Sequence, residues 1–215
     1  MTPPVSDDPR GWLIETVASL SRPGRQIARR IRLYGQGYIH PLRHRRALRR
    51  LQQRFPVRTA GFVCLGNICR SPYAEYRLRQ LLEEAGVADS VQLSSTGFIG
   101  PGRPSPELAQ EVARARGIEL APHRSRTMDP DFLKRTELIF VMTGRQLRDL
   151  RGKYGRPDAV HLGDMDPGPV SGRDIPDPYS HPREVFQEAY DRIDAALEPL
   201  GRLLAESVAS ANGPR

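Results

Sequence analysis

Cys64 and Arg70 enclose a short loop, CLGNICR, whose residues suit the binding of an anion. Gly66 lets the backbone turn closely there, and Asn67 is one of the few residue types that tolerate a positive φ. Such a loop can point successive backbone N–H groups inward, and a helix that opens at Ser71 adds the partial positive charge of its N-terminus. Arg70 contributes a planar guanidinium that can bind two oxygens of one phosphate. The loop therefore predicts a cradle for phosphate.

Cys64 has two interpretations. The charges that would hold a phosphate would also stabilise a thiolate, which is the nucleophilic form of cysteine. The alternative is a small buried residue at the end of a strand, which describes most lone cysteines. A cysteine followed six positions later by an arginine also arises by chance, so this pair does not by itself separate a nucleophile from a core residue.

The loop needs a strand before it and a helix behind it, and the sequence supplies both. Residues 59–64 form a short apolar run typical of a strand, and residues 71–86 place leucines along one face of a helix that Gly86 would end. Further elements with the same patterns follow: strands at 91–96, 137–142 and 158–163, and helices at 106–117, 144–155 and 183–206.

This alternation predicts the α/β class, with a doubly wound parallel sheet of four strands and helices on both faces. In such a sheet, ligands bind beyond the carboxyl ends of the strands. The Cys64 loop begins at such an end.

The stretch FVCLGNICRSP, residues 62–72, resembles almost letter for letter the signature of bacterial low-molecular-weight protein tyrosine phosphatases. The resemblance implies that Cys64 is the nucleophile and Arg70 the phosphate clamp, while Ser71 donates its hydroxyl to the thiolate and Asn67 holds the loop. It implies that the other loop residues bind phosphate or support the loop, namely Leu65, Gly66, Ile68 and Cys69. The family often keeps a second thiol at the position of Cys69, where it can form a reversible disulfide with the nucleophile. A buried cysteine at a helix start is the alternative.

The resemblance extends over about residues 59–207. Ser95 in LSSTG and His123 in PHRSR would support Asn67 and the loop from behind. The family's acid loop resembles RDIPDPYSHP, residues 173–182, in which Asp177 and Tyr179 match its Asp-Pro-Tyr element. Expelling a phenolate requires a proton donor, so Asp177 would be the general acid, and then the base that activates water. Three nearby carboxylates compete for this role: Asp164, Asp166 and Asp174.

Tyr179 would flank the substrate ring, but two positions depart from many family members. Thr143 stands where many members have an aspartate, and Ser180 where they have an aromatic residue. Arginine-phosphate phosphatases of this superfamily carry threonine at the position of Ile68, so Ile68 favours phosphotyrosine. Arsenate reductases of the same fold need further downstream cysteines, and none follows Cys69. A phosphate-binding module without turnover is the remaining alternative. No metal or cofactor is expected, because Arg70 and backbone amides can neutralise the transferred group.

Two parts are expected along the chain: a basic, partly helical extension at residues 1–57 and the phosphatase-like domain at 58–210. Residues 1–58 hold thirteen arginines and three acids, which gives them a net charge of +10. The whole chain has a net charge of +8, so residues 59–215 have a net charge of −2. One or two short helices are expected within 11–33, and a basic helix at 41–55. Arginine-rich residues 10–58 could lie on an anionic membrane surface, whereas nucleic acid is not expected as a partner. A solvated arm without a partner is the alternative.

The composition is that of a folded protein: 38% of the 215 residues are hydrophobic and 27% are charged. No apolar run approaches the roughly 20 residues of a membrane span, and no secretory leader is evident, so a cytoplasmic location is expected. Two cysteines in such a chain suggest reactive thiols rather than a disulfide scaffold. The expected partners are a phosphotyrosine protein and, by the resemblance to bacterial members, an exopolysaccharide-associated tyrosine kinase.

Overall fold

A parallel sheet of four strands lies at the centre of the computed structural model, which describes residues 39–170 and 172–211. The strand order is β2-β1-β3-β4, with β2 at Gln92–Gly97, β1 at Thr59–Cys64, β3 at Leu138–Val141 and β4 at Val160–His161. All three pairings are parallel. The expected α/β sheet is therefore confirmed, and the loop that leaves β1 starts between two neighbouring strands.

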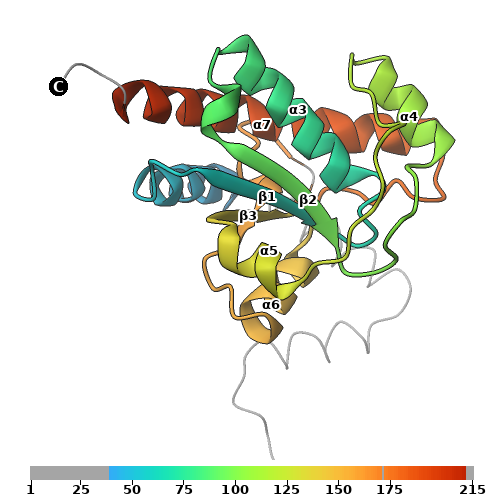
Figure 1. Ribbon diagram of the computed structural model, residues 1–215, viewed down its shortest axis with the longest axis horizontal. Helices are drawn as coiled ribbons and strands as arrows, with labels where there is room; N and C mark the ends of the chain where they lie inside the picture. Colours follow the sequence, from blue (N-terminus) through green and yellow to red (C-terminus); the bar gives the residue numbers. More distant parts are fainter. Residues whose placement is uncertain (1–38, 171, 212–215) are drawn as a thin grey trace, which may run out of the picture.

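Helices cover both faces of this sheet (Figure 1). One face carries α3 (Arg70–Glu84), α4 (Glu107–Arg114), α7 (Arg183–Ala211) and a helix over residues 39–52. The other face carries α5 (Pro130–Arg135) and α6 (Gly144–Lys153). Two short 3-10 turns lie at Ala88–Ser90 and Leu162–Asp164.

The strands divide their side chains between two hydrophobic clusters because successive residues of a strand point to opposite faces. Phe62 and Phe140 belong to the cluster under α3 and α7, and their rings stack with centroids 5.5 Å apart. Val63 and Val141 belong to the cluster under α5 and α6. All four are fully buried, and each such side chain contributes about 1.5–3 kcal/mol to folding. This burial on both faces holds the end of β1 in place.

The helix over residues 39–52 packs against the same core as α7. Ala47 and Leu51 are buried in it, and the ring nitrogen Nε2 of His40 lies 2.7 Å from the backbone oxygen of Asp166. A basic helix was expected at residues 41–55, and its presence is confirmed. The helices expected within residues 11–33 lie outside the described part of the chain.

Two expected elements differ clearly in length from the structure. β4 is only two residues long, because Leu162 begins a 3-10 turn in place of an extended strand over 158–163. α7 runs to Ala211, beyond the expected end at 206, with Pro199 inside it.

In the part of the chain that the structure describes, no helix is both long enough and apolar enough to span a bilayer.

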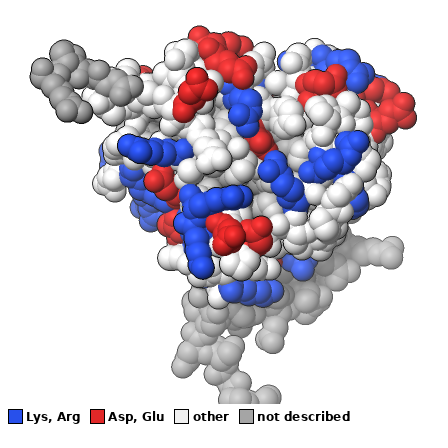
Figure 2. Space-filling view, viewed as in Figure 1, with Lys and Arg blue, Asp and Glu red and all other residues white. Residues whose placement is uncertain are grey.

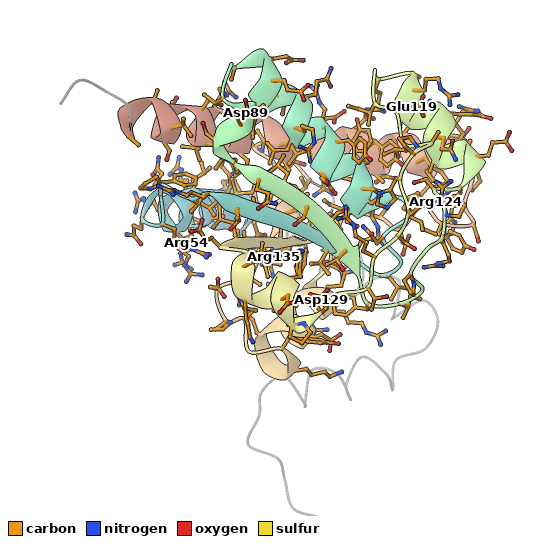
Figure 3. The ribbon with its side chains drawn as sticks, viewed as in Figure 1. Arg54, Asp89, Glu119, Arg124, Asp129 and Arg135 are labelled. Carbon is orange, nitrogen blue, oxygen red and sulfur yellow. The ribbon has the colours of Figure 1, made fainter. Side chains whose placement is uncertain are left out.

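α5 was not expected from the sequence. Asp129 caps its start by accepting a hydrogen bond from the backbone N–H of Phe132 at 2.6 Å, and Pro130 occupies the first helical position (Figure 3). Both are ordinary start signals, but the helix has six residues and too little periodicity to stand out.

Candidate active site

Cys64 is the last residue of β1, and its sulfur lies where the loop folds back on itself. The side chain is buried, and Sγ accepts hydrogen bonds from the backbone N–H of Asn67 at 3.2 Å and from the hydroxyl of Ser71 at 3.0 Å. α3 begins at Arg70, so its N-terminus closes the same loop. Two hydrogen-bond donors and a helix N-terminus therefore surround the sulfur, which is the arrangement of an anion-binding loop. The structure thus places the Ser71 hydroxyl within hydrogen-bond distance of the sulfur.

Asn67 joins the loop to three other segments. Its φ of 52° lies in the left-handed region, as the sequence predicted, and its side chain is fully buried. The amide nitrogen donates to the hydroxyls of Ser71 and Ser95, both at 2.9 Å, and the amide oxygen accepts from the backbone N–H of Arg126 at 2.7 Å. Because Ser71 accepts from Asn67, its own proton is left to point at the Cys64 sulfur.

His123 supports the loop from behind, as expected. Its Nε2 lies 2.7 Å from the backbone oxygen of Asn67, and a carbonyl can only accept, so Nε2 carries the proton. Burial lowers the pKa of His123 below its ordinary value, although the hydrogen bond to Asn67 opposes this. The ring is therefore neutral at neutral pH and acts as a fixed donor.

Two residues near the loop were missed by sequence reasoning. Gly97 ends β2 so close to the loop that an added Cβ would lie 2.8 Å from the backbone oxygen of Leu65. Arg103 donates from Nη2 to the backbone oxygen of Gly66 and from Nε to that of Gly100, both at 3.0 Å. Neither residue stands next to the Cys64 motif in sequence, so only the fold reveals these contacts.

Arg70 is buried and reaches the acid loop. Its Nη1 donates to the backbone oxygen of Ile175 at 3.1 Å, and its Nη2 is in ionic contact with the Asp177 carboxylate. Within residues 39–170 and 172–211, its Nε has no hydrogen-bond partner although it is buried. A buried guanidinium N–H next to Cys64 is a donor suited to a phosphate oxygen.

The three carboxylates that competed with Asp177 are engaged elsewhere. Asp164 pairs with Arg173 at 2.6 Å, and Asp166 pairs with Arg192 at 2.7 Å. Asp174 accepts at Oδ1 from the backbone N–H of Gly144 at 2.8 Å and lies 2.9 Å from Nε2 of His161.

Burial by itself would raise the pKa of Asp174, but the hydrogen bonds from His161 and Gly144 outweigh it and lower the pKa. Asp174 thereby anchors the start of the acid loop to α6. Asp177 is left at the loop's tip, with 46% of its side chain exposed.

The predicted residues surround one small pocket of about 120 Å³. Its walls combine the Cys64 loop with the acid loop and with two residues from the segment after β2. The lining residues are Cys64, Leu65, Gly66, Ile68, Cys69, Arg70, Ile99, Arg103, Asp177 and Tyr179. Ser71, Asn67, Ser95 and His123 stand behind this lining, so the structure brings all of the predicted site residues together.

The mouth of the pocket has an aromatic side and a polar side. Tyr179 is 55% exposed and stands at the rim, and Ser180 beside it has a φ of 61°. A second hollow of about 500 Å³ shares Leu65, Arg70 and Asp177 with the pocket, and it extends toward Thr143, Arg145, Lys153 and Tyr154. This neighbouring surface is where residues that flank a bound side chain would lie.

Cys69 is a buried free thiol in the pocket wall. Burial raises its pKa, and the nearby Cys64 adds to the effect. Cys69 is therefore protonated at neutral pH, which disfavours it as a nucleophile.

The fold and sequence match known proteins. Residues 59–210 match the family model described as low molecular weight phosphotyrosine protein phosphatase. A probable low molecular weight protein-tyrosine-phosphatase, EpsP, from Ralstonia solanacearum is 32% identical over 144 residues, which are 66% of this chain and 92% of the relative. Low molecular weight protein-tyrosine phosphatase A from Mycobacterium tuberculosis is 34% identical over 157 residues, 71% of this chain and 94% of the relative.

Solved structures show the same architecture. Wzb from Vibrio vulnificus in complex with benzylphosphonate has a TM-score of 0.57 and 27% identity, and the match covers 67% of this chain and 97% of Wzb. The YwlE arginine phosphatase has a TM-score of 0.61 and 25% identity, with 68% of this chain and 95% of YwlE covered.

Proposed function

Because the chain belongs to the low molecular weight phosphotyrosine protein phosphatase family, we propose that it hydrolyses phosphotyrosine in proteins through a phosphocysteine at Cys64. Arg70 is the phosphate clamp, and Asp177 is the general acid and base. The observation that carries the proposal is the placement of these three side chains around one pocket, with two hydrogen bonds donated to the Cys64 sulfur.

The first step transfers the phosphoryl group to the enzyme. The Cys64 thiolate attacks phosphorus in line with the leaving oxygen, the S–P bond forms, and the P–O bond to tyrosine breaks. Asp177 gives its proton to the departing phenolate, which leaves as neutral tyrosine. In the second step, Asp177 takes a proton from a water molecule whose oxygen attacks phosphorus. The S–P bond then breaks, releasing inorganic phosphate and the thiolate.

Arg70 and the loop amides supply the charge that this reaction needs. In the structure, Arg70 contacts Asp177, and a phosphate dianion in the pocket would compete for the same guanidinium. Once the phosphate has replaced Asp177 on Arg70, the carboxyl is released from its ion pair and can face the leaving oxygen. A protonated carboxyl beside the leaving oxygen is the form that a general acid requires.

An arginine-phosphate phosphatase is the second candidate, since one structural relative is named as such. Ile68 lies in the pocket wall and Tyr179 at its rim. The aliphatic side chain of Ile68 suits a phenyl ring better than a charged guanidinium. We therefore favour phosphotyrosine over phosphoarginine.

The test measures turnover of one peptide sequence that carries either phosphotyrosine or phosphoarginine. We expect a preference for phosphotyrosine of about tenfold or more in kcat/KM, equivalent to about 1.4 kcal/mol of transition-state stabilisation. Ile68→Thr should reduce the preference for phosphotyrosine over phosphoarginine. Equal or reversed rates for the wild-type chain would refute the assignment of phosphotyrosine as the substrate. Activity retained in Cys64→Ser would refute the role of Cys64 as the nucleophile.

The role of Asp177 is tested with aryl phosphates whose leaving groups differ in basicity. Asp177→Ala should slow the release of a basic phenolate far more than that of a weakly basic one, because only the former needs a proton. Asp129→Ala is the matched control, since Asp129 caps α5 and does not line the pocket. If Asp177→Ala lowers both rates by the same factor, it is not the general acid.

We also propose that the protein acts in the cytoplasm on a tyrosine kinase of exopolysaccharide export, with residues 10–58 directed toward an anionic membrane surface. The support is the similarity to bacterial relatives and the excess of arginine before residue 59. The test is co-sedimentation with anionic vesicles at increasing salt. It compares the full chain with a variant in which five arginines become glutamine, namely Arg22, Arg25, Arg29, Arg30 and Arg32. Equal binding of both chains would refute a membrane role for those arginines.

A further inference from the structure

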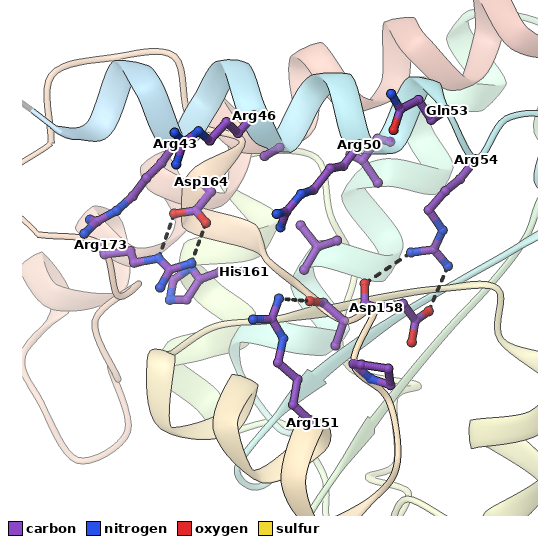
Figure 4. A pocket seen from close by; sticks show the side chains of 15 residues that line it. Arg43, Arg46, Arg50, Gln53, Arg54, Arg151, Asp158, His161, Asp164 and Arg173 are labelled. Carbon is purple, nitrogen blue, oxygen red and sulfur yellow. Dashed lines mark hydrogen bonds and ion pairs between the residues drawn. The ribbon is translucent and has the colours of Figure 1, made fainter. Parts of the chain in front are cut away.

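A further hollow, larger than the two at the active site, lies between the helix over residues 39–52 and the β4 edge of the sheet (Figure 4). Its volume is about 840 Å³, within the range of about 300–1,000 Å³ that is usual for small-molecule sites. Its lining shares no residue with the pocket at Cys64. Six of its lining residues are arginines: Arg43, Arg46, Arg50, Arg54, Arg151 and Arg173.

Two of these arginines pair with acidic side chains of the described lining. Asp158 pairs with Arg54 at 2.9 Å, and Asp164 pairs with Arg173 at 2.6 Å. Among residues 39–170 and 172–211, no other carboxylate lines the hollow, so this lining carries four positive charges in excess. Elsewhere the charges are mixed: on the face shown in Figure 2, acidic and basic side chains lie interspersed.

The remaining arginines come from two elements that face each other. Arg43, Arg46 and Arg50 lie three and four residues apart on the helix over residues 39–52, so they share one face of it. Like charges at this spacing destabilise a helix. Among the described residues, none of the three has an ion-pair partner.

Arg151 approaches from α6 on the opposite side, and Figure 4 shows its guanidinium and that of Arg50 pointing into the hollow from opposite directions. Arg151 is held by a hydrogen bond of 3.0 Å from Nη2 to the backbone oxygen of Ala159. Leu51, Ala159 and Val160 add apolar surface between the charged groups. The hollow thus combines several guanidinium groups with an apolar wall.

We propose that this hollow binds a small polyphosphate, a molecule with two or more linked phosphate groups such as a nucleoside triphosphate. Guanidinium groups bind phosphate oxygens in pairs, so arginines on opposite walls match a chain of phosphates better than one isolated anion. The excess of four positive charges matches the charge of a triphosphate. The apolar wall can accept the organic part of such a molecule. The site is independent of the proposed phosphatase reaction.

The test is calorimetric titration of the full chain carrying Cys64→Ser, which prevents turnover. The probes are adenosine triphosphate and inorganic tripolyphosphate, with adenosine as the uncharged comparison. The site variant is Arg46→Glu with Arg50→Glu. The control variant is Arg45→Glu with Arg49→Glu, which makes the same charge change on the same helix at exposed positions outside the hollow.

We expect saturable binding of both polyphosphates and none of adenosine. The site variant should bind at least about tenfold more weakly, whereas the control variant should stay within about threefold of the parent chain. Thermal unfolding of all three proteins shows whether each variant is folded. Since the cradle at Cys64 is the same in all three, any phosphate bound there cannot produce this difference.

The proposal is overturned if the parent chain shows no saturable binding of either polyphosphate. It is also overturned if both variants weaken binding equally, because the attraction would then come from net charge alone. Tighter, Arg50-dependent binding of polyglutamate or of anionic vesicles would assign the hollow to an acidic protein or to a membrane instead.

Discussion

Replacing Asn67 by alanine should strongly destabilise the protein. The substitution removes three hydrogen bonds, at 2.9 Å to Ser71, 2.9 Å to Ser95 and 2.7 Å from the backbone of Arg126. At about 0.5–1.5 kcal/mol for each bond, the loss is about 1.5–4.5 kcal/mol. The φ of 52° adds about 1–2 kcal/mol of strain, because alanine disfavours the left-handed region.

The assay is urea unfolding of the parent chain, Asn67→Ala, Ser95→Ala and the double variant. The hydrogen bond to Asn67 joins Ser95 to the loop, so Ser95→Ala should lower the free energy of unfolding by about 0.5–1.5 kcal/mol. The double variant should lose less than the sum of the two, by about 1 kcal/mol, because both single changes remove the same bond. A loss below about 1 kcal/mol for Asn67→Ala, or additive losses in the cycle, would refute the role given to Asn67.

Three further predictions follow from the same geometry. Gly97→Ala should lower kcat on an aryl phosphate, because the added Cβ would lie 2.8 Å from the backbone oxygen of Leu65 and displace the loop. An unchanged kcat would contradict this displacement of the loop. Ser71→Ala should slow phosphorylation of Cys64 by about 10- to 100-fold in single-turnover kinetics, because it removes one hydrogen bond to a charged group. An unchanged rate would show that the hydroxyl does not assist the sulfur. The free energy of unfolding should fall as pH drops from about 7 to about 5, because burial lowers the pKa of His123 below the ordinary 6.5 and the unfolded chain therefore takes up the proton first. Urea curves of His123→Gln should show a weaker pH dependence, and an equal one would exclude His123 as a contributor.

The parts of the site that could be predicted from sequence are those encoded in one short stretch. Cys64, Asn67 and Arg70 fall within seven consecutive residues, and the strand before them and the helix after them have clear hydrophobic periodicity. The left-handed conformation of Asn67 is one that its residue type tolerates. Local chemistry and local structure coincide there.

The parts that could not be predicted depend on contacts between distant segments. Gly97 and Arg103 act on the loop through close backbone approaches that no local pattern encodes. The choice among the neighbouring aspartates is also tertiary, since Asp174 is distinguished from Asp177 by its contact with the start of α6. The arginine-lined hollow forms where the helix over residues 39–52 packs beside β4. In the sequence alone, its arginines have the pattern of an ordinary charged surface.

The central claim is that Cys64 carries the phosphoryl group during turnover. The direct measurement is acid quenching within the first turnover of an aryl phosphate with a weakly basic leaving group, followed by mass spectrometry of the peptide over residues 59–70. The Asp177→Ala chain should accumulate one phosphoryl group on Cys64, because its first step needs no acid while its second step lacks a base. Turnover without a phosphorylated peptide, or with the phosphoryl group on Cys69, would contradict the account.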